Sequence, residues 1–162
     1  MKIFDKKMII WLVGLITLVF EFVIVTINLT RLNILTYLLY IGFFPAFILF
    51  VTSLVYSFQA NTSKLSKYIL SVIVAVIFSA ILLVYFGVYI NEEIVERIIQ
   101  NSMTFDTMQV SINTATVGDN IQMFLLYIAF SGIGCFIGNL VYKKRRKSIN
   151  SHNNNDTSEY DS

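Results

Sequence analysis

The sequence predicts an all-α protein, a four-helix transmembrane bundle with its N and C termini both cytoplasmic. Of its 162 residues, 56% are hydrophobic, whereas a soluble domain is about 45–50% apolar. These residues gather in four runs, and about 20 apolar residues suffice for a helix to cross a bilayer core. Lys and Arg are also unevenly distributed among the connecting segments, which favours one orientation in the membrane.

The first run covers residues 8–28 and follows three lysines, Lys2, Lys6 and Lys7. A basic start before an apolar run is also typical of a secretory signal peptide. This run is longer than an ordinary signal core, and no small-residue cleavage site follows it. We therefore expect an uncleaved anchor that forms the first span.

The second run, residues 34–58, has Pro45 near its middle. Proline removes one helical hydrogen bond and clashes with the carbonyl four residues earlier, which is that of Ile41. Within a bundle, neighbouring helices can satisfy the freed carbonyl. We interpret Pro45 as a kink in the helix, with a ligand site as the alternative.

The third run, residues 68–90, contains no charge, and the segment 91–120 after it is the longest connection. Apolar residues recur at helical spacing in the first part of this loop, so we expect the third helix to continue past the membrane as an amphipathic extension. Further on, Met108, Val110 and Ile112 alternate with polar residues, a weak strand signal. The loop is either a solvated cap or a contact surface for a partner.

The fourth run, residues 121–142, ends in the basic cluster of residues 143–147. The tail 143–162 is basic and then polar, with too little apolar surface to fold, so we expect it to be disordered. Residues 1–142 then form one four-span membrane domain.

Basic residues are concentrated in three segments: the start of the chain, the connection between the second and third runs, and the tail beside the fourth run. The other two connections carry one basic residue each, Arg31 and Arg97. Because Lys and Arg favour the cytoplasmic side, both termini are expected inside and the loop 91–120 outside.

Small residues repeat along the spans at intervals that allow close helix packing. Gly134 and Gly138 form a GxxxG pattern, Ser71 and Ala75 lie one turn apart, and Gly14 lies in the first span. We expect these residues to face other helices, within this chain rather than between chains.

Glu21 lies well inside the first span, where an acidic side chain costs about 2.5–3.5 kcal/mol on insertion scales. It shares a helix face with Thr17 and Asn28. Counting about 1.5 Å per residue, it lies at a depth near three residues of the other spans, which are Pro45, Ser79 and Tyr127. Three interpretations stay open: a proton or cation site, an interhelical hydrogen bond made by a neutral carboxyl, and a pairing with a cation on another protein.

The sequence offers no constellation for catalysis, metal binding or cofactor binding. It has one His and one Cys, too few for an ordinary zinc site, and it has neither a phosphate-binding loop nor a His-Glu-x-x-His motif. We expect no enzymatic activity and no cofactor. The basic cluster follows a span directly, which favours attraction to anionic lipid rather than to nucleic acid.

Three features resemble the uncharacterised small four-span membrane proteins of Gram-positive bacteria: Phe44-Pro45-Ala46, Thr52-Ser53-Leu54, and the basic turn before the third span. The resemblance implies architecture and a bacterial cytoplasmic membrane, but no activity. We expect a non-enzymatic accessory, regulatory or immunity-type protein that acts through helix contacts or its outer loop. Its partners would be the lipid bilayer and a membrane protein or a second copy. The alternative is a small oligomeric transporter or channel that uses Glu21.

Overall fold

The computed structural model describes residues 6–59, 64–102 and 117–158, and it is helical with no strand in these ranges. Its long helices are α1 (Lys6–Asn28), α3 (Phe44–Gln59), α4 (Lys64–Tyr89) and α6 (Val117–Ser158). Four segments are long and apolar enough to span a membrane: residues 8–31, 34–59, 65–85 and 121–146. The predicted all-α fold with four candidate spans is therefore confirmed.

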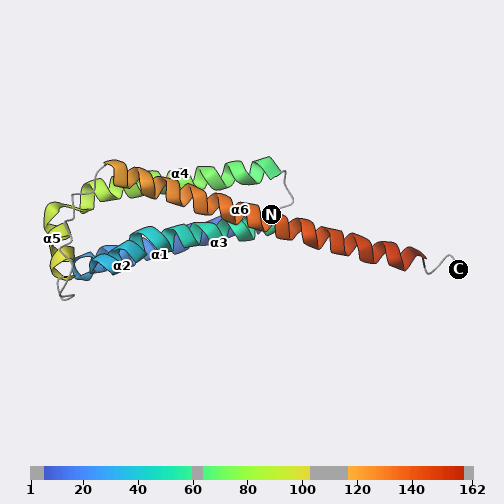
Figure 1. The fold of residues 1–162 in the computed structure, drawn as a ribbon, viewed down its shortest axis with the longest axis horizontal. Helices are drawn as coiled ribbons and strands as arrows, with labels where there is room; N and C mark the ends of the chain where they lie inside the picture. Colours follow the sequence, from blue (N-terminus) through green and yellow to red (C-terminus); the bar gives the residue numbers. More distant parts are fainter. Residues whose placement is uncertain (1–5, 60–63, 103–116, 159–162) are drawn as a thin grey trace, which may run out of the picture.

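The four spans form an elongated bundle (Figure 1). α3 packs most extensively against α6, α4 also packs against α6, and α1 packs against α3. A central cluster of buried residues draws on all four of these helices: Leu18, Ala46, Leu49, Ala75, Phe78, Leu82 and Tyr127. α1 begins at the end of the bundle where α6 leaves it (Figure 1). The cytoplasmic location of that end stays a prediction.

The second span consists of three consecutive helical pieces. The short α2 (Ile34–Leu38) is followed by a π-helical turn, Leu39–Phe43, and then by α3. Within the π turn the Phe44 amide donates to the Leu39 carbonyl, five residues back. The widened turn lies directly before Pro45, whose ring cannot fit against the preceding turn of a regular helix.

α2 begins with a reciprocal cap. The Thr36 amide donates to Asn33 Oδ1 at 2.8 Å, and the Asn33 amide donates to Thr36 Oγ1 at 3.0 Å. These bonds satisfy backbone donors that have no partner within the helix. They set the point at which the chain turns from α1 into the second span.

α5 (Glu92–Gln100) is a separate helix that lies across the end of the bundle opposite the α6 extension (Figure 1). The expected continuation of the third span is therefore corrected, although the amphipathic character of this segment is present. α4 ends at Tyr89 because Asn91 caps a new helix, accepting from the Ile94 amide at 3.0 Å. The weak strand signal at Met108, Val110 and Ile112 lies outside the described residues.

α5 is held against the connection between α1 and α2. Ile98 is buried on its inner face. Asn101 Nδ2 donates to the carbonyls of Thr30 and Leu32 at 3.0 and 3.1 Å, and the Ile34 amide donates to Ser102 Oγ at 2.8 Å. This part of the loop closes one end of the bundle.

α6 continues beyond the bundle as far as Ser158 (Figure 1). The sequence predicts a disordered tail, whereas residues 143–158 are helical in this structure; residues 159–162 lie outside the described ranges. Extending an existing helix requires no new nucleation, and the Lys and Arg residues after Tyr142 are good helix formers.

Candidate functional site: a polar ladder, Lys67 and Glu21

Small polar side chains form a buried ladder where α3, α4 and α6 meet. Ser131 Oγ on α6 donates to the Ser71 carbonyl on α4 at 3.1 Å, and it lies 2.8 Å from Ser53 Oγ on α3. One turn nearer the α6 extension, Ser57 Oγ donates to the Cys135 carbonyl at 2.9 Å. These bonds link three spans side by side.

The spacing of the ladder explains how the sequence builds it. On each helix its positions recur every four residues, which places them on one face. The three lines are 53 and 57 on α3, 67, 71, 75 and 79 on α4, and 127, 131, 135 and 139 on α6. Small residues on one face allow helix backbones to approach closely.

Gly134 and Gly138 lie directly against α3. A Cβ atom at Gly134 would lie 2.3 Å from the Phe50 carbonyl oxygen, and one at Gly138 would lie 2.4 Å from that of Leu54. Real Cβ atoms essentially never approach so closely. The structure thus places the GxxxG pattern within the chain, against the backbone of the second span. Gly14 of α1 similarly contacts the side chain of Thr52.

Lys67 is the feature that sequence reasoning missed. It lies in the first turns of α4 rather than in a polar turn, and it is only 2% exposed. Its Nζ donates to the Ser57 carbonyl at 2.8 Å and to Asn139 Oδ1 at 3.2 Å, and it lies 4.6 Å from the centre of the Tyr142 ring. One signal in the sequence could have identified Lys67: it lies four residues before Ser71, which places both residues on one face of α4.

Lys67 acts as a helix cap supplied from another helix. Ser57 is among the last residues of α3, whose terminal carbonyls have no partner within the helix. A cation there also interacts favourably with the negative end of the helix dipole. Lys67 therefore ties α4 to the end of α3 and, through Asn139, to α6.

Tyr127 takes up the carbonyl that Pro45 leaves without its helical partner. Tyr127 is 1% exposed, and its hydroxyl donates to the Ile41 carbonyl. Ile41 is four residues before Pro45, as the effect of proline on the preceding turn requires. The freed group of the second span is thus satisfied by α6.

Glu21, on α1, lies near Tyr127. Neither of its carboxylate oxygens is accessible, and neither has a hydrogen-bond partner among the described residues. Glu21 is close enough to Tyr127 for an electrostatic interaction. Because an unpaired ionised carboxylate is very costly in a low-dielectric surrounding, we expect its neutral form to predominate.

The other predicted members of the Glu21 site bond elsewhere. Thr17 Oγ1 donates to the Val13 carbonyl at 2.9 Å, and Asn28 Nδ2 donates to the Ile24 carbonyl at 2.8 Å. Ser79 Oγ donates to the Ala75 carbonyl at 2.7 Å. The structure therefore brings Tyr127 close to Glu21. Pro45 is linked to this pair indirectly, because the Tyr127 hydroxyl bonds to the Ile41 carbonyl that Pro45 leaves without its helical partner.

Removing the Tyr127 hydroxyl provides a test of this arrangement. Tyr127→Phe should lower stability by about 0.6 kcal/mol, the average measured for hydrogen bonds between membrane helices, and by no more than about 1.7 kcal/mol, the largest measured value. In a Pro45→Ala background the new amide at position 45 can reach the Ile41 carbonyl, so the same change should cost less. Apparent melting temperatures in detergent for the four-member cycle measure this coupling. Equal losses in both backgrounds would show that Tyr127 and Pro45 act independently.

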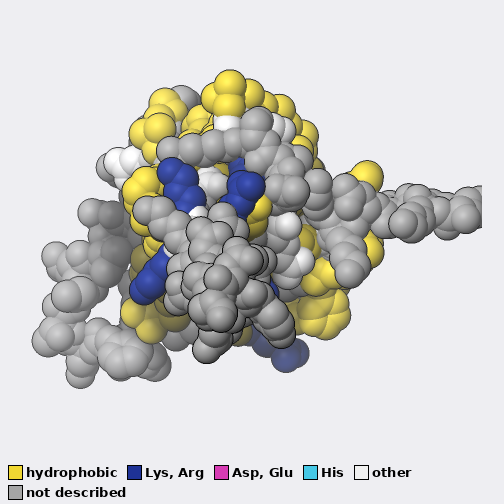
Figure 2. Space-filling view, turned by 90° about the vertical axis from the view of Figure 1, so that its right-hand side faces the viewer, with side chains coloured by type: hydrophobic (Ala, Val, Ile, Leu, Met, Phe, Trp, Pro, Cys, Tyr) yellow, Lys and Arg dark blue, Asp and Glu magenta, His cyan; other side chains and the backbone are white. Residues whose placement is uncertain are grey.

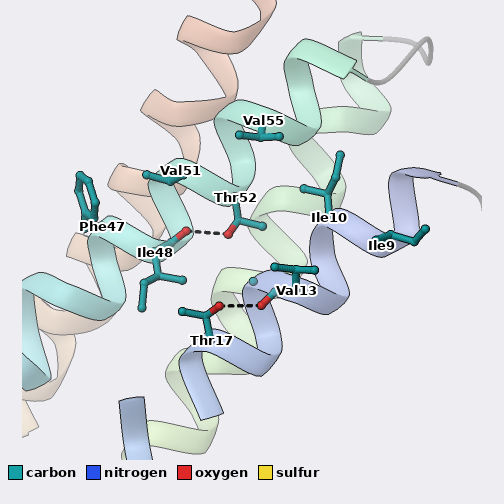
Figure 3. A pocket seen from close by; sticks show the side chains of 10 residues that line it. Ile9, Ile10, Val13, Thr17, Phe47, Ile48, Val51, Thr52 and Val55 are labelled. Carbon is teal, nitrogen blue, oxygen red and sulfur yellow. Dashed lines mark hydrogen bonds between the residues drawn. The ribbon is translucent and has the colours of Figure 1, made fainter. Parts of the chain in front are cut away.

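A groove of about 380 Å³ runs between α1 and α3 (Figure 3). Apolar side chains form most of its walls, with Gly14, Thr17 and Thr52 between them. Both threonine hydroxyls turn back to their own helices, Thr17 to the Val13 carbonyl and Thr52 to the Ile48 carbonyl. The groove thus offers hydrocarbon contact without an unmet polar group.

Within residues 6–59, 64–102 and 117–158, no group of three or more His, Cys, Asp or Glu side chains is placed to hold a metal ion. The described residues of this site therefore offer hydrogen-bonding groups, the buried ammonium group of Lys67 and the buried carboxyl of Glu21. No protein-family model, no curated protein and no solved structure matches this chain.

Proposed function

We propose that this protein is a non-enzymatic accessory protein of a bacterial cytoplasmic membrane, with a regulatory or immunity-type role, which acts by presenting α1 to a partner membrane protein. The observation that carries this proposal is the asymmetry of the bundle. Only 17% of the most apolar stretch of the first span is buried, compared with 33–39% for the other three.

The interior contacts support the same interpretation. The polar ladder and the two glycines hold α3, α4 and α6 together, while α1 packs mainly on α3. Exposed apolar side chains follow one side of α1, among them Val19, Phe20 and Val23. Helix association in membranes depends on packing rather than on the hydrophobic effect, so α1 can pack against another helix without opening the ladder.

Site-specific photocrosslinking in native membranes tests this proposal. A benzophenone amino acid at Val19 or Val23 on α1 should give one discrete adduct of the same mass at both positions. The controls are Ile77 and Val84, which are similarly exposed on α4, and these should give only diffuse lipid adducts. Mass spectrometry then identifies the partner or a second copy. Discrete adducts from α4 but not from α1 would contradict the proposal.

The second candidate function is a small oligomeric transporter or channel. It is favoured by the two Glu21 oxygens, which are inaccessible and lack partners among the described residues. Against it, the apolar side chains of the central buried cluster, which include Leu49, Ala75 and Phe78, form a layer around Tyr127. A proton path would have to cross this layer, which is why we favour the accessory role.

A further inference from the structure

The groove between α1 and α3 has the character of a hydrocarbon site. Its walls carry aliphatic or aromatic side chains from both helices, among them Ile10 and Val13 on α1 and Val51 and Val55 on α3 (Figure 3). Apolar cavities without unmet polar groups do not hold ordered water. An occupant therefore has to supply apolar surface and no hydrogen-bonding group at this depth.

Toward the end of α3, the face that lines the groove comes close to the basic side chain of Arg145. Val51, Val55 and Phe58 lie at intervals of four and three residues, so they share one face of α3. The guanidinium carbon of Arg145 lies 5.5 Å from the centre of the Phe58 ring. Exposed basic side chains surround the base of the α6 extension at this end of the bundle (Figure 2): Lys143, Lys144, Arg145 and Arg146.

We propose that an anionic phospholipid binds here, with one acyl chain in the groove and its phosphate at Arg145. The groove supplies the apolar contact, and the guanidinium supplies a planar donor group that matches phosphate oxygens. Anionic lipids are enriched in the cytoplasmic leaflet, and the basic end of the bundle is the end predicted to lie there. The site is independent of the partner proposed for the outward side of α1.

The single tryptophan of the chain is a built-in reporter for this site. Trp11 does not line the groove, but it directly follows Ile10 of the groove wall, and its ring lies 5.5 Å from that of Tyr56, the residue after Val55 of the opposite wall. Brominated acyl chains quench tryptophan fluorescence at short range, so a chain in the groove is close enough to quench Trp11. The full-length protein is reconstituted in phosphatidylcholine vesicles, and chain-brominated phosphatidylglycerol or chain-brominated phosphatidylcholine is then titrated in.

Wild-type protein should bind phosphatidylglycerol about fivefold more tightly than phosphatidylcholine, the preference expected from one basic residue near the membrane surface. High salt should weaken this preference. Arg145→Gln should abolish it, whereas Arg146→Gln should retain it. Equal quenching of the wild type by both lipids would overturn the proposal, and the groove would then be a candidate binding site for a partner helix.

The acyl-chain position is tested with a matched pair on α1. Val13, which lines the groove, and Val19, which does not, are both 56% exposed. Val13→Phe should fill the groove and reduce quenching by both lipids, while Val19→Phe should behave as wild type. Val51→Phe provides the same test from α3 if Val13→Phe does not fold, as judged by circular dichroism. Wild-type quenching in both folded groove variants would place the chain elsewhere and refute the site.

Discussion

Replacing Gly134 or Gly138 with alanine should lower the apparent melting temperature of the protein in detergent more than any other single methyl addition to α6. The added Cβ atoms would lie 2.3 and 2.4 Å from main-chain carbonyl oxygens of α3. Backbone cannot move aside as a flexible side chain can, so the two helices must separate. Overpacking of this kind costs about 1–3 kcal/mol, and the double variant should lose more than either single variant.

Gly132 provides the matched control, because a Cβ atom there would meet nothing within 4 Å. Gly132→Ala should be neutral or slightly stabilising, since alanine is the better helix former. If all three variants have the same melting temperature as wild type, the close approach of α3 and α6 is not present in the folded protein. Equal losses in all three would point to a general sensitivity of α6 instead.

Lys67→Met should produce the second large loss of stability. Methionine fills a similar volume but donates no hydrogen bond, so the Ser57 carbonyl and Asn139 Oδ1 lose this donor inside the bundle. Leaving a buried polar group unsatisfied costs about 1–3 kcal/mol, and the favourable interaction of a cation with the end of α3 is lost as well. A shift in apparent melting temperature measures the combined effect.

Lys144→Met is the control for this experiment. Lys144 is exposed on α6, and substitutions at such surface positions usually change stability by less than about 0.5 kcal/mol. The variant removes the same charge from the same end of the protein. Should Lys67→Met prove as stable as Lys144→Met, the cap on α3 contributes nothing to the fold.

The spans could be predicted from the sequence because hydrophobic length and the need to satisfy backbone groups in lipid determine them together. The freed Ile41 carbonyl was also predictable, since proline chemistry depends only on local sequence. Counting residues along the spans also placed Tyr127 at the depth of Pro45. The bond between its hydroxyl and the Ile41 carbonyl was not predictable, because it depends on how α6 packs against the second span.

Lys67 and α5 show where local patterns mislead. A lysine beside a polar turn predicts a solvated charge and a topology signal, and only the neighbouring helix end and Asn139 explain why it is buried. The apolar spacing of Ile94 and Ile98 correctly predicted an amphipathic helix. The break at Asn91 depends on a competition between continuing α4 and capping a new helix, which periodicity alone does not resolve.

Glu21 is the residue on which the two functional interpretations differ most. If the bundle is a sealed scaffold that acts through its contacts, the carboxyl is a neutral group next to Tyr127 and carries no flux. Glutamine has nearly the same size and hydrogen-bonding capacity but cannot ionise. Glu21→Gln should therefore fold and should retain the accessory function.

Proton flux in vesicles that contain purified protein tests this central claim most directly. Wild-type protein and Glu21→Gln, reconstituted at equal density and followed with an internal pH-sensitive dye under an imposed membrane potential, should give the same rate of pH change. A faster rate in the wild type that Glu21→Gln abolishes would contradict the accessory role and would establish Glu21 as a transport site.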